Sequence, residues 1–121
     1  MPYSASSMKL HVVEQSAEVT HIALEGSLDV EGVNVISDAV YFNLTTRKKP
    51  AIVDLARVDF IGSLGMGMLV RVAQSLRRQG FGMVLMNPRG TCAESLQLTN
   101  IDQVIPFVTT REEAIARLNG A

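Results

Sequence analysis

Two short apolar runs, separated by a stretch with helical periodicity, constrain the fold of this chain more than any other feature. The runs are Ala51–Leu55 and Met83–Met86, and Asp54 is the one polar residue in them. Continuous apolar runs of this length are typical of central strands in a parallel sheet that is covered on both faces. Parallel neighbours need a crossover connection, usually a helix, and the residues between the runs supply one. The pattern therefore predicts an α/β domain.

Before the first run, the sequence predicts a hairpin and then a helix. Met8–Glu14 and Val19–Leu24 partly alternate between apolar and polar residues, which is typical of half-buried strands. Asp29 is a candidate N-cap for the helix. The helix is expected to end on Arg47–Lys49 before Pro50, because cations stabilise the negative end of the helix dipole. Its apolar face carries Val33, Ile36, Val40 and Leu44.

After the first run, helices and strands continue to alternate. A helix is predicted over Leu64–Gln79, and Thr91–Glu94 has the spacing of a capping box that opens another helix. Val104–Val108 is predicted to be an edge strand because it contains Pro106. A second capping box, Thr110–Glu113, is predicted to open the last helix. The inward face expected for the first of these helices is Leu69, Val72, Ala73 and Leu76.

The length and composition indicate one domain. The chain has 121 residues, of which 47% are hydrophobic, so a packed core is expected. Residues 1–7 are small and polar and are predicted to form a flexible tail, which leaves residues 8–121 as the domain. The predicted fold class is α/β: a single domain with a mixed, mostly parallel β-sheet flanked by about four α-helices.

Several classes of protein are disfavoured by what the sequence lacks. A single cysteine, Cys92, allows no internal disulfide, and no run approaches the roughly 20 apolar residues of a membrane span. The start of the chain does not resemble a signal peptide. A net charge of −1 gives no electrostatic basis for binding nucleic acid. We therefore expect a cytoplasmic protein without metal, cofactor, nucleic-acid partner or membrane insertion.

The segment Asp59–Gly67 carries the functional information. It follows a buried strand and opens a helix, at the edge of the sheet where α/β proteins usually place their sites. Gly65 and Gly67 fall in the first helical turn, where each costs about 1 kcal/mol relative to Ala. We infer that the backbone there approaches another group closely.

Catalytic motifs do not fit this segment. Its glycines have the wrong spacing for a dinucleotide fingerprint, and no lysine follows them as in a phosphate-binding loop. A hydrolase elbow requires glycine where Ile61 stands, and a histidine after the serine, whereas His11 and His21 both precede it. No catalytic residues are therefore predicted. Ser63 has two interpretations at this point, a helix N-cap or a functional hydroxyl. Leu64 and Met66 are either exposed contacts or core residues.

Three stretches together resemble the STAS family, the sulfate transporter and anti-sigma factor antagonist domains. Val53–Gly67 (VDLARVDFIGSLGMG) is similar to the signature D-L-S-x-V-x-F-I-D-S-S-G-L-G. Gly26–Asp29 is similar to the G-x-L-D motif of the family, and the region from Leu96–Asp102 to Glu112–Ala114 is similar to its L-x-L-T-G-L-D and terminal E-E-A motifs. The resemblance covers nearly the whole chain and implies a mixed sheet flanked by helices.

The resemblance also implies a function. Freestanding members are typically anti-sigma factor antagonists that work by partner switching: the unphosphorylated form binds an anti-sigma factor, often a serine kinase, serine phosphorylation ends the binding, and a phosphatase restores it. The alternative implied by other members is a structural subunit of a stressosome or membrane-transporter assembly, without phosphorylation. In both cases the domain binds proteins and is not an enzyme.

The resemblance selects candidate site residues and exposes two departures from the motif. Gly62 stands where the signature has an acid, and Leu64 stands where it has the second serine. Ser63 matches the first serine and is the candidate for phosphorylation. The predicted partner-binding residues are Gly26, Ser27, Asp29, Gly62, Ser63, Leu64, Gly65 and Met66.

Overall fold

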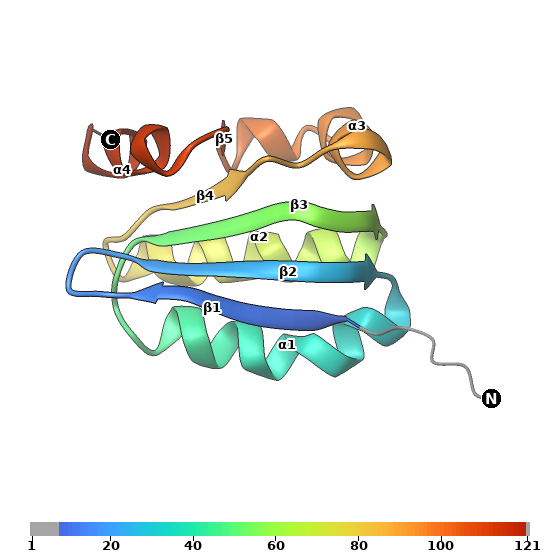
Figure 1. The fold of residues 1–121 in the computed structure, drawn as a ribbon, viewed down its shortest axis with the longest axis horizontal. Coiled ribbons are helices and arrows are strands. Elements are labelled where there is room, and N and C mark those ends of the chain that lie inside the picture. Colours follow the sequence, from blue (N-terminus) through green and yellow to red (C-terminus); the bar gives the residue numbers. More distant parts are fainter. Residues whose placement is uncertain (1–7, 121) are drawn as a thin grey trace.

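One five-stranded sheet forms the centre of the structure, a computed structural model in which residues 8–120 are described (Figure 1). The predicted tail, residues 1–7, lies outside the described residues. The strands are β1 (Lys9–Gln15), β2 (Thr20–Leu28), β3 (Ala51–Ile61), β4 (Met83–Met86) and β5 (Phe107–Val108). The helices are α1 (Val30–Thr45), α2 (Ser63–Arg78), α3 (Gly90–Leu98) and α4 (Arg111–Gly120), with a short 3-10 helix, η1 (Ile101–Gln103). The predicted α/β class is confirmed.

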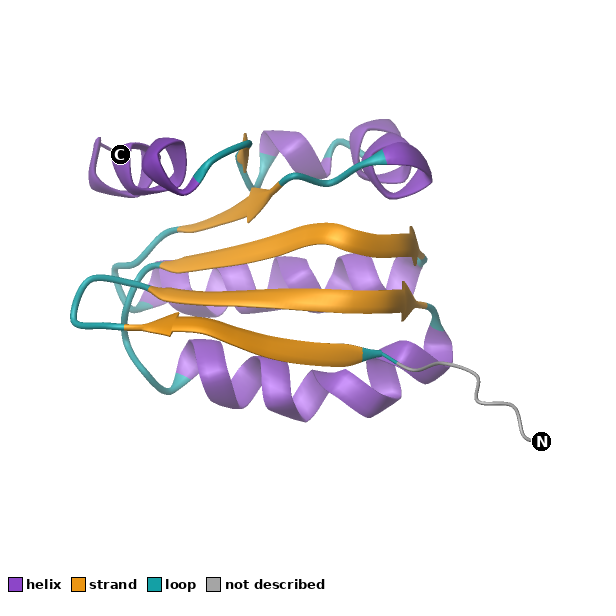
Figure 2. Ribbon diagram, in the orientation of Figure 1, coloured by secondary structure: helices purple, strands orange, loops and turns teal. Residues whose placement is uncertain are grey.

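The strands follow one another in the sheet in the same order as in the chain. β1 and β2 pair antiparallel as the predicted hairpin, and the other neighbouring pairs are parallel. Because the crossovers from β2 to β3 and from β3 to β4 step in the same direction, connections of the same hand place α1 and α2 on one face. Figure 2 shows these two helices behind the sheet. Among residues 8–120, no helix lies in front of β1 and β2 (Figure 2).

The core has two parts, one on each side of the sheet. α1, α2 and α3 bury apolar residues on one side, including the whole predicted inward face of α2. On the other side, Ile52 of β3 and Val84 of β4 pack with Ala114 of α4. β3 and β4 are therefore covered on both faces where their sequences are continuous apolar runs.

β2 and β3 are both longer than predicted. β2 continues to Leu28, and β3 continues to Ile61. The register between them shifts between Ala23 and Glu25 and again beyond Gly26. These irregularities interrupt the regular alternation by which a strand is recognised in a sequence. The longer strands carry the candidate site residues to the edge of the sheet.

The basic residues after α1 do not lie in its last turn, so that expectation was wrong. The helix ends at Thr45, before Arg47–Lys49. Arg47 instead donates hydrogen bonds to the Thr20 hydroxyl at 2.9 Å and to the Ser16 carbonyl at 3.0 Å. The guanidinium thus joins the segment after α1 to the β1–β2 hairpin.

Of the two predicted capping boxes, one is confirmed in part and one is wrong. At the start of α4 the Glu113 amide donates to the Thr110 hydroxyl at 3.0 Å, but the Glu113 carboxylate accepts from the Thr109 amide, at 2.8 Å, and not from the Thr110 amide. In the other, α3 already begins at Gly90, and its N-cap makes no side-chain hydrogen bond. The Thr91 hydroxyl donates instead to a backbone carbonyl of β3.

The last strand is shorter than predicted. β5 comprises only Phe107–Val108 and lies at the edge of the sheet, as expected. The residues before it form η1 and an irregular segment. Pro106 lies outside the strand, although its carbonyl accepts a hydrogen bond from the Leu85 amide at 2.9 Å.

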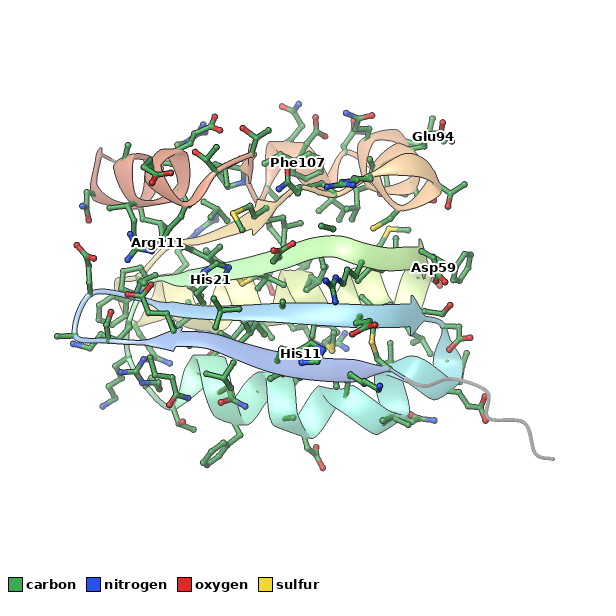
Figure 3. The ribbon with its side chains drawn as sticks, in the orientation of Figure 1. His11, His21, Asp59, Glu94, Phe107 and Arg111 are labelled. Atoms are coloured by element: carbon green, nitrogen blue, oxygen red, sulfur yellow. The ribbon has the colours of Figure 1, made fainter. Side chains whose placement is uncertain are left out.

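His21 is a buried titratable residue on the side of the sheet that α4 covers in part. Its side chain is 5% exposed, and both ring nitrogens lack a hydrogen-bond partner within residues 8–120. Burial lowers the pKa of His21 below the usual 6.5, against the opposing attraction of Asp54 and Glu14. Glu14 is itself bound by Arg111 at the start of α4, with two contacts of 2.9 Å. Figure 3 shows Arg111 on the same side of the sheet as His21.

We expect stability to fall as the pH decreases below 6.5. Since the unfolded chain binds a proton at His21 more readily than the folded chain, protonation favours unfolding. The loss is at most about 1.4 kcal/mol per pH unit. Chemical denaturation across this range measures it. His21→Val should flatten the pH dependence there. An unchanged slope in His21→Val would contradict the assignment.

Candidate functional site

The two predicted loops meet at the carboxyl ends of β2 and β3. Leu28 of β2 pairs with Ile61 of β3, and the Gly62 amide donates to the Leu28 carbonyl at 3.0 Å. We call the surface formed by Gly26–Asp29 and Gly62–Met66 the strand-end surface. It lies at the arrowhead end of β2 and β3, where α1 and α2 begin (Figure 1).

The start of α1 is held tightly against β2. Asp29 is the N-cap, as predicted, and its carboxylate accepts a hydrogen bond from the Gly32 amide at 2.8 Å. A Cβ atom on Gly32 would lie 1.9 Å from the Ser27 carbonyl oxygen, far inside any permitted contact. Gly32 is therefore required for this approach, although the sequence analysis did not single it out.

The start of α2 also lies close to the strand ends. A Cβ on Gly65 would lie 2.9 Å from Leu28 Cβ and 3.0 Å from Ile61 Cγ1. This close approach confirms the interpretation of Gly65 as a packing glycine. The same interpretation of Gly67 was wrong, because a Cβ there would meet only the flexible end of Arg71.

Ser63 is the first residue of α2 and does not cap it. The N-cap is Gly62, which has extended backbone and no capping side chain. The cap interpretation of Ser63 was therefore wrong. Ser63 is exposed, and its hydroxyl forms no hydrogen bond seen among the described residues. The hydroxyl is thus accessible to another protein at the positive end of a 16-residue helix.

A shallow apolar groove of about 300 Å³ lies beside Ser63. Three large apolar side chains around it are about half exposed or more: Val30 at 60%, Phe60 at 47% and Leu64 at 48%. Met66, by contrast, is partly buried and packs against the core, and its sulfur lies 3.2 Å from the Thr99 hydroxyl. Of the two interpretations given for both residues, exposure holds for Leu64 and core packing for Met66.

Asp59 joins three elements at this edge and was not among the predicted site residues. Its carboxylate accepts a hydrogen bond of 2.6 Å from the Ser27 hydroxyl on β2. Its backbone carbonyl accepts one of 3.0 Å from the Thr91 hydroxyl on α3. Figure 3 shows Asp59 at the carboxyl end of β3. A polar residue near the end of a buried strand was the available signal.

Neither His21 nor Cys92 supplies a general base or a nucleophile beside Ser63. His21 pairs with Ile52, nine positions before Ile61 on β3, which is about 30 Å away at 3.3 Å per residue. Burial and the negative charge of Asp59 raise the pKa of the Cys92 thiol to about 11, so it stays protonated at neutral pH. In the described part of the chain, no three His, Cys, Asp or Glu side chains gather as metal ligands.

The described helices also bear on membrane insertion. Within residues 8–120, no helix combines the length and the apolar character that a membrane crossing requires.

Comparison with known families assigns the domain. The model of the STAS domain matches residues 11–114, and the chain therefore belongs to the STAS domain family. The match spans the strand-end surface and both of its motifs, so the resemblance read from the sequence is confirmed.

Solved structures with the same fold include freestanding proteins and a transporter. An anti-sigma factor antagonist from Mycobacterium paratuberculosis matches with a TM-score of 0.81 and 21% identity, over 93% of this chain and 95% of that one. The anti-sigma factor antagonist SpoIIAA in its unphosphorylated form matches with a TM-score of 0.70 and 25% identity, over 95% and 98%. The phosphorylated form, from Bacillus, also matches, with a TM-score of 0.65 and 25% identity, over 92% and 98%. The murine anion transporter Slc26a9 matches with a TM-score of 0.72 and 12% identity, over 89% of this chain but 19% of that one.

Proposed function

We propose that this chain is a cytoplasmic anti-sigma factor antagonist that binds an anti-sigma factor through the strand-end surface and has no catalytic activity of its own. The observation that carries the proposal is the exposed apolar groove beside Ser63, within the STAS signature. Large apolar side chains gathered at one exposed site are characteristic of protein interaction surfaces. The size of the chain matches that of the freestanding antagonists, since each covers nearly all of the other.

Phosphorylation of Ser63 would switch this surface. A phosphate adds roughly −1.5 to −2 charges, and the start of α2 favours an anion by about 0.3–1 kcal/mol. The fold is therefore expected to tolerate the modification. A partner that rests on Val30, Phe60 and Leu64 would meet a bulky dianion at the edge of its contact, and binding would be lost.

The alternative is a structural subunit of a larger assembly, a stressosome or a transporter complex, in which Ser63 is not modified. Gly62 and Leu64 favour this alternative, because they replace the acid and the second serine of the family signature. The fold is also present in the transporter Slc26a9, where this chain matches about a fifth of the protein.

Incubation with the anti-sigma kinase of the same cell and ATP tests both parts of the proposal. We expect a stable complex without ATP, one added phosphate in the intact mass of the wild-type chain, none in Ser63→Ala, and release of the phosphorylated chain. Thr91→Ala serves as the control for a second hydroxyl near the strand-end surface. A complex that forms but gains no phosphate would reject the switch. Failure to bind any anti-sigma factor, with recovery of a multi-subunit assembly, would support the structural alternative.

A further inference from the structure

A second cavity lies at the opposite end of the sheet from Ser63. It has a volume of about 440 Å³ and is bounded by the end of α2, the loop into β4, the segment before β5, and α4. The Ala51 amide donates to the Gly82 carbonyl at 3.0 Å, which places this loop beside the start of β3. In Figure 1, α4 and the start of β4 lie at the left end, whereas α2 begins at the right.

Most of the cavity wall is apolar. Phe81, Val104, Pro106 and Leu118 contribute side chains from the loop, the segment before β5, and α4. Gly82 lies closely against α4, since a Cβ there would be 3.2 Å from Leu118 Cδ2. Small-molecule sites typically have volumes of about 300–1,000 Å³, apolar walls and a few polar groups that fix the orientation of the ligand. The cavity has a volume in this range and a mostly apolar wall.

Two arginines supply the polar groups. Arg77 of α2 and Arg117 of α4 both line the cavity, and none of the lining residues is acidic. Arg77 donates one long hydrogen bond, 3.4 Å, to the Val104 carbonyl. No ion pair of either guanidinium is found within residues 8–120. Each guanidinium has five N–H donors, so most of the donor capacity of the pair is available to a ligand.

We propose that this cavity binds an amphipathic small-molecule anion. An acyl chain or aromatic ring would occupy the apolar part, and a carboxylate or phosphate would bind Arg77 and Arg117. The planar guanidinium matches either head group with two parallel hydrogen bonds. Both arginines also lie in the last turns of their helices, where their positive charge offsets the negative end of the helix dipole. This site is additional to the proposed protein-binding function and does not depend on it.

Titration of the ¹⁵N-labelled full chain with decanoate, below its micelle concentration, tests the site. We expect saturable shifts in the amide signals of Gly80, Gly82 and Leu118, with the signals of Ser63–Met66 unchanged. Decanol has the same chain without the charge and should bind at least about tenfold more weakly. Decyl phosphate, run in parallel, identifies which head group is preferred. Shifts confined to other surfaces, or equal affinity for decanol and decanoate, would overturn the proposal.

Variants separate the two guanidinium groups from a general effect of positive charge. Arg77→Gln combined with Arg117→Gln should weaken decanoate binding by roughly tenfold or more and leave decanol binding unchanged. Arg78→Gln is the matched control, because Arg78 is in the same last turn of α2 but does not line the cavity. Unchanged decanoate binding in the double variant, or an equal loss in Arg78→Gln, would overturn the proposal. A thermal melt of each variant checks that it is folded.

Discussion

Gly32→Ala should destabilise the domain by about 3 kcal/mol, which corresponds to a decrease in Tm of roughly 10 °C or more. The new Cβ would lie 1.9 Å from the Ser27 carbonyl oxygen, so the first turn of α1 or the end of β2 has to move. Neither moves freely. The Asp29 carboxylate holds the Gly32 amide, and the Ser27 hydroxyl is bonded to Asp59. The steric cost therefore exceeds the roughly 1 kcal/mol by which alanine is the better helix former.

Gly67→Ala is the matched control for this substitution. Gly67 is also in the first part of a helix, but a Cβ there would meet only the flexible guanidinium of Arg71. Alanine should therefore leave the stability unchanged or raise it by up to about 1 kcal/mol. Thermal melts of the two variants and the wild type measure the difference. Equal stability of Gly32→Ala and the wild type would show that the end of β2 yields to the helix, contrary to the packing described.

The central strands were predicted from continuous apolar runs. The apolar runs Ala51–Leu55 and Met83–Met86 became the start of β3 and the whole of β4, because both faces of these strands are covered there and no polar alternation is needed. The extension of β3 to Ile61 could not be predicted in this way. It depends on pairing with β2 across two register shifts, and that pairing is a tertiary property.

The location of the candidate site at the strand ends was predicted, but the N-cap of α2 and the hydrogen bond between Asp59 and Ser27 were not. Both loops meet as expected, because the carboxyl ends of neighbouring parallel strands lie at the same edge. Ser63 was expected as a possible cap from local preference alone. The bond from the Gly62 amide to the Leu28 carbonyl fixes Gly62 at the strand end, and Gly62 becomes the N-cap. Asp59 was visible in the sequence as a polar residue near a strand end, but its bond to Ser27 depends on the register of two strands and could not be predicted.

Leu64→Asp is expected to weaken binding of the anti-sigma factor by roughly thirtyfold or more while leaving the Tm nearly unchanged. The side chain is 48% exposed beside the groove, so the free domain loses little buried area when it is replaced. An acid in the first turn of α2 also gains about 0.3–1 kcal/mol from the helix dipole, which offsets part of that loss. In the complex, however, the carboxylate would replace an apolar contact next to Val30 and Phe60 and would have to be desolvated.

Two further variants decide what a loss of binding means. Phe42→Asp places the same change at a side chain that is 69% exposed near the other end of α1, and it should leave binding intact. Leu64→Asn removes the apolar contact without adding charge. If Leu64→Asn weakens binding nearly as much as Leu64→Asp, the apolar contact carries the interaction. If only Leu64→Asp weakens binding, a negative charge beside Ser63 is sufficient to release the partner. Phosphorylation of Ser63 would then be expected to release the partner in the same way. Unimpaired binding in Leu64→Asp would remove the groove from the interface, and a large loss of stability would show that Leu64 belongs to the core.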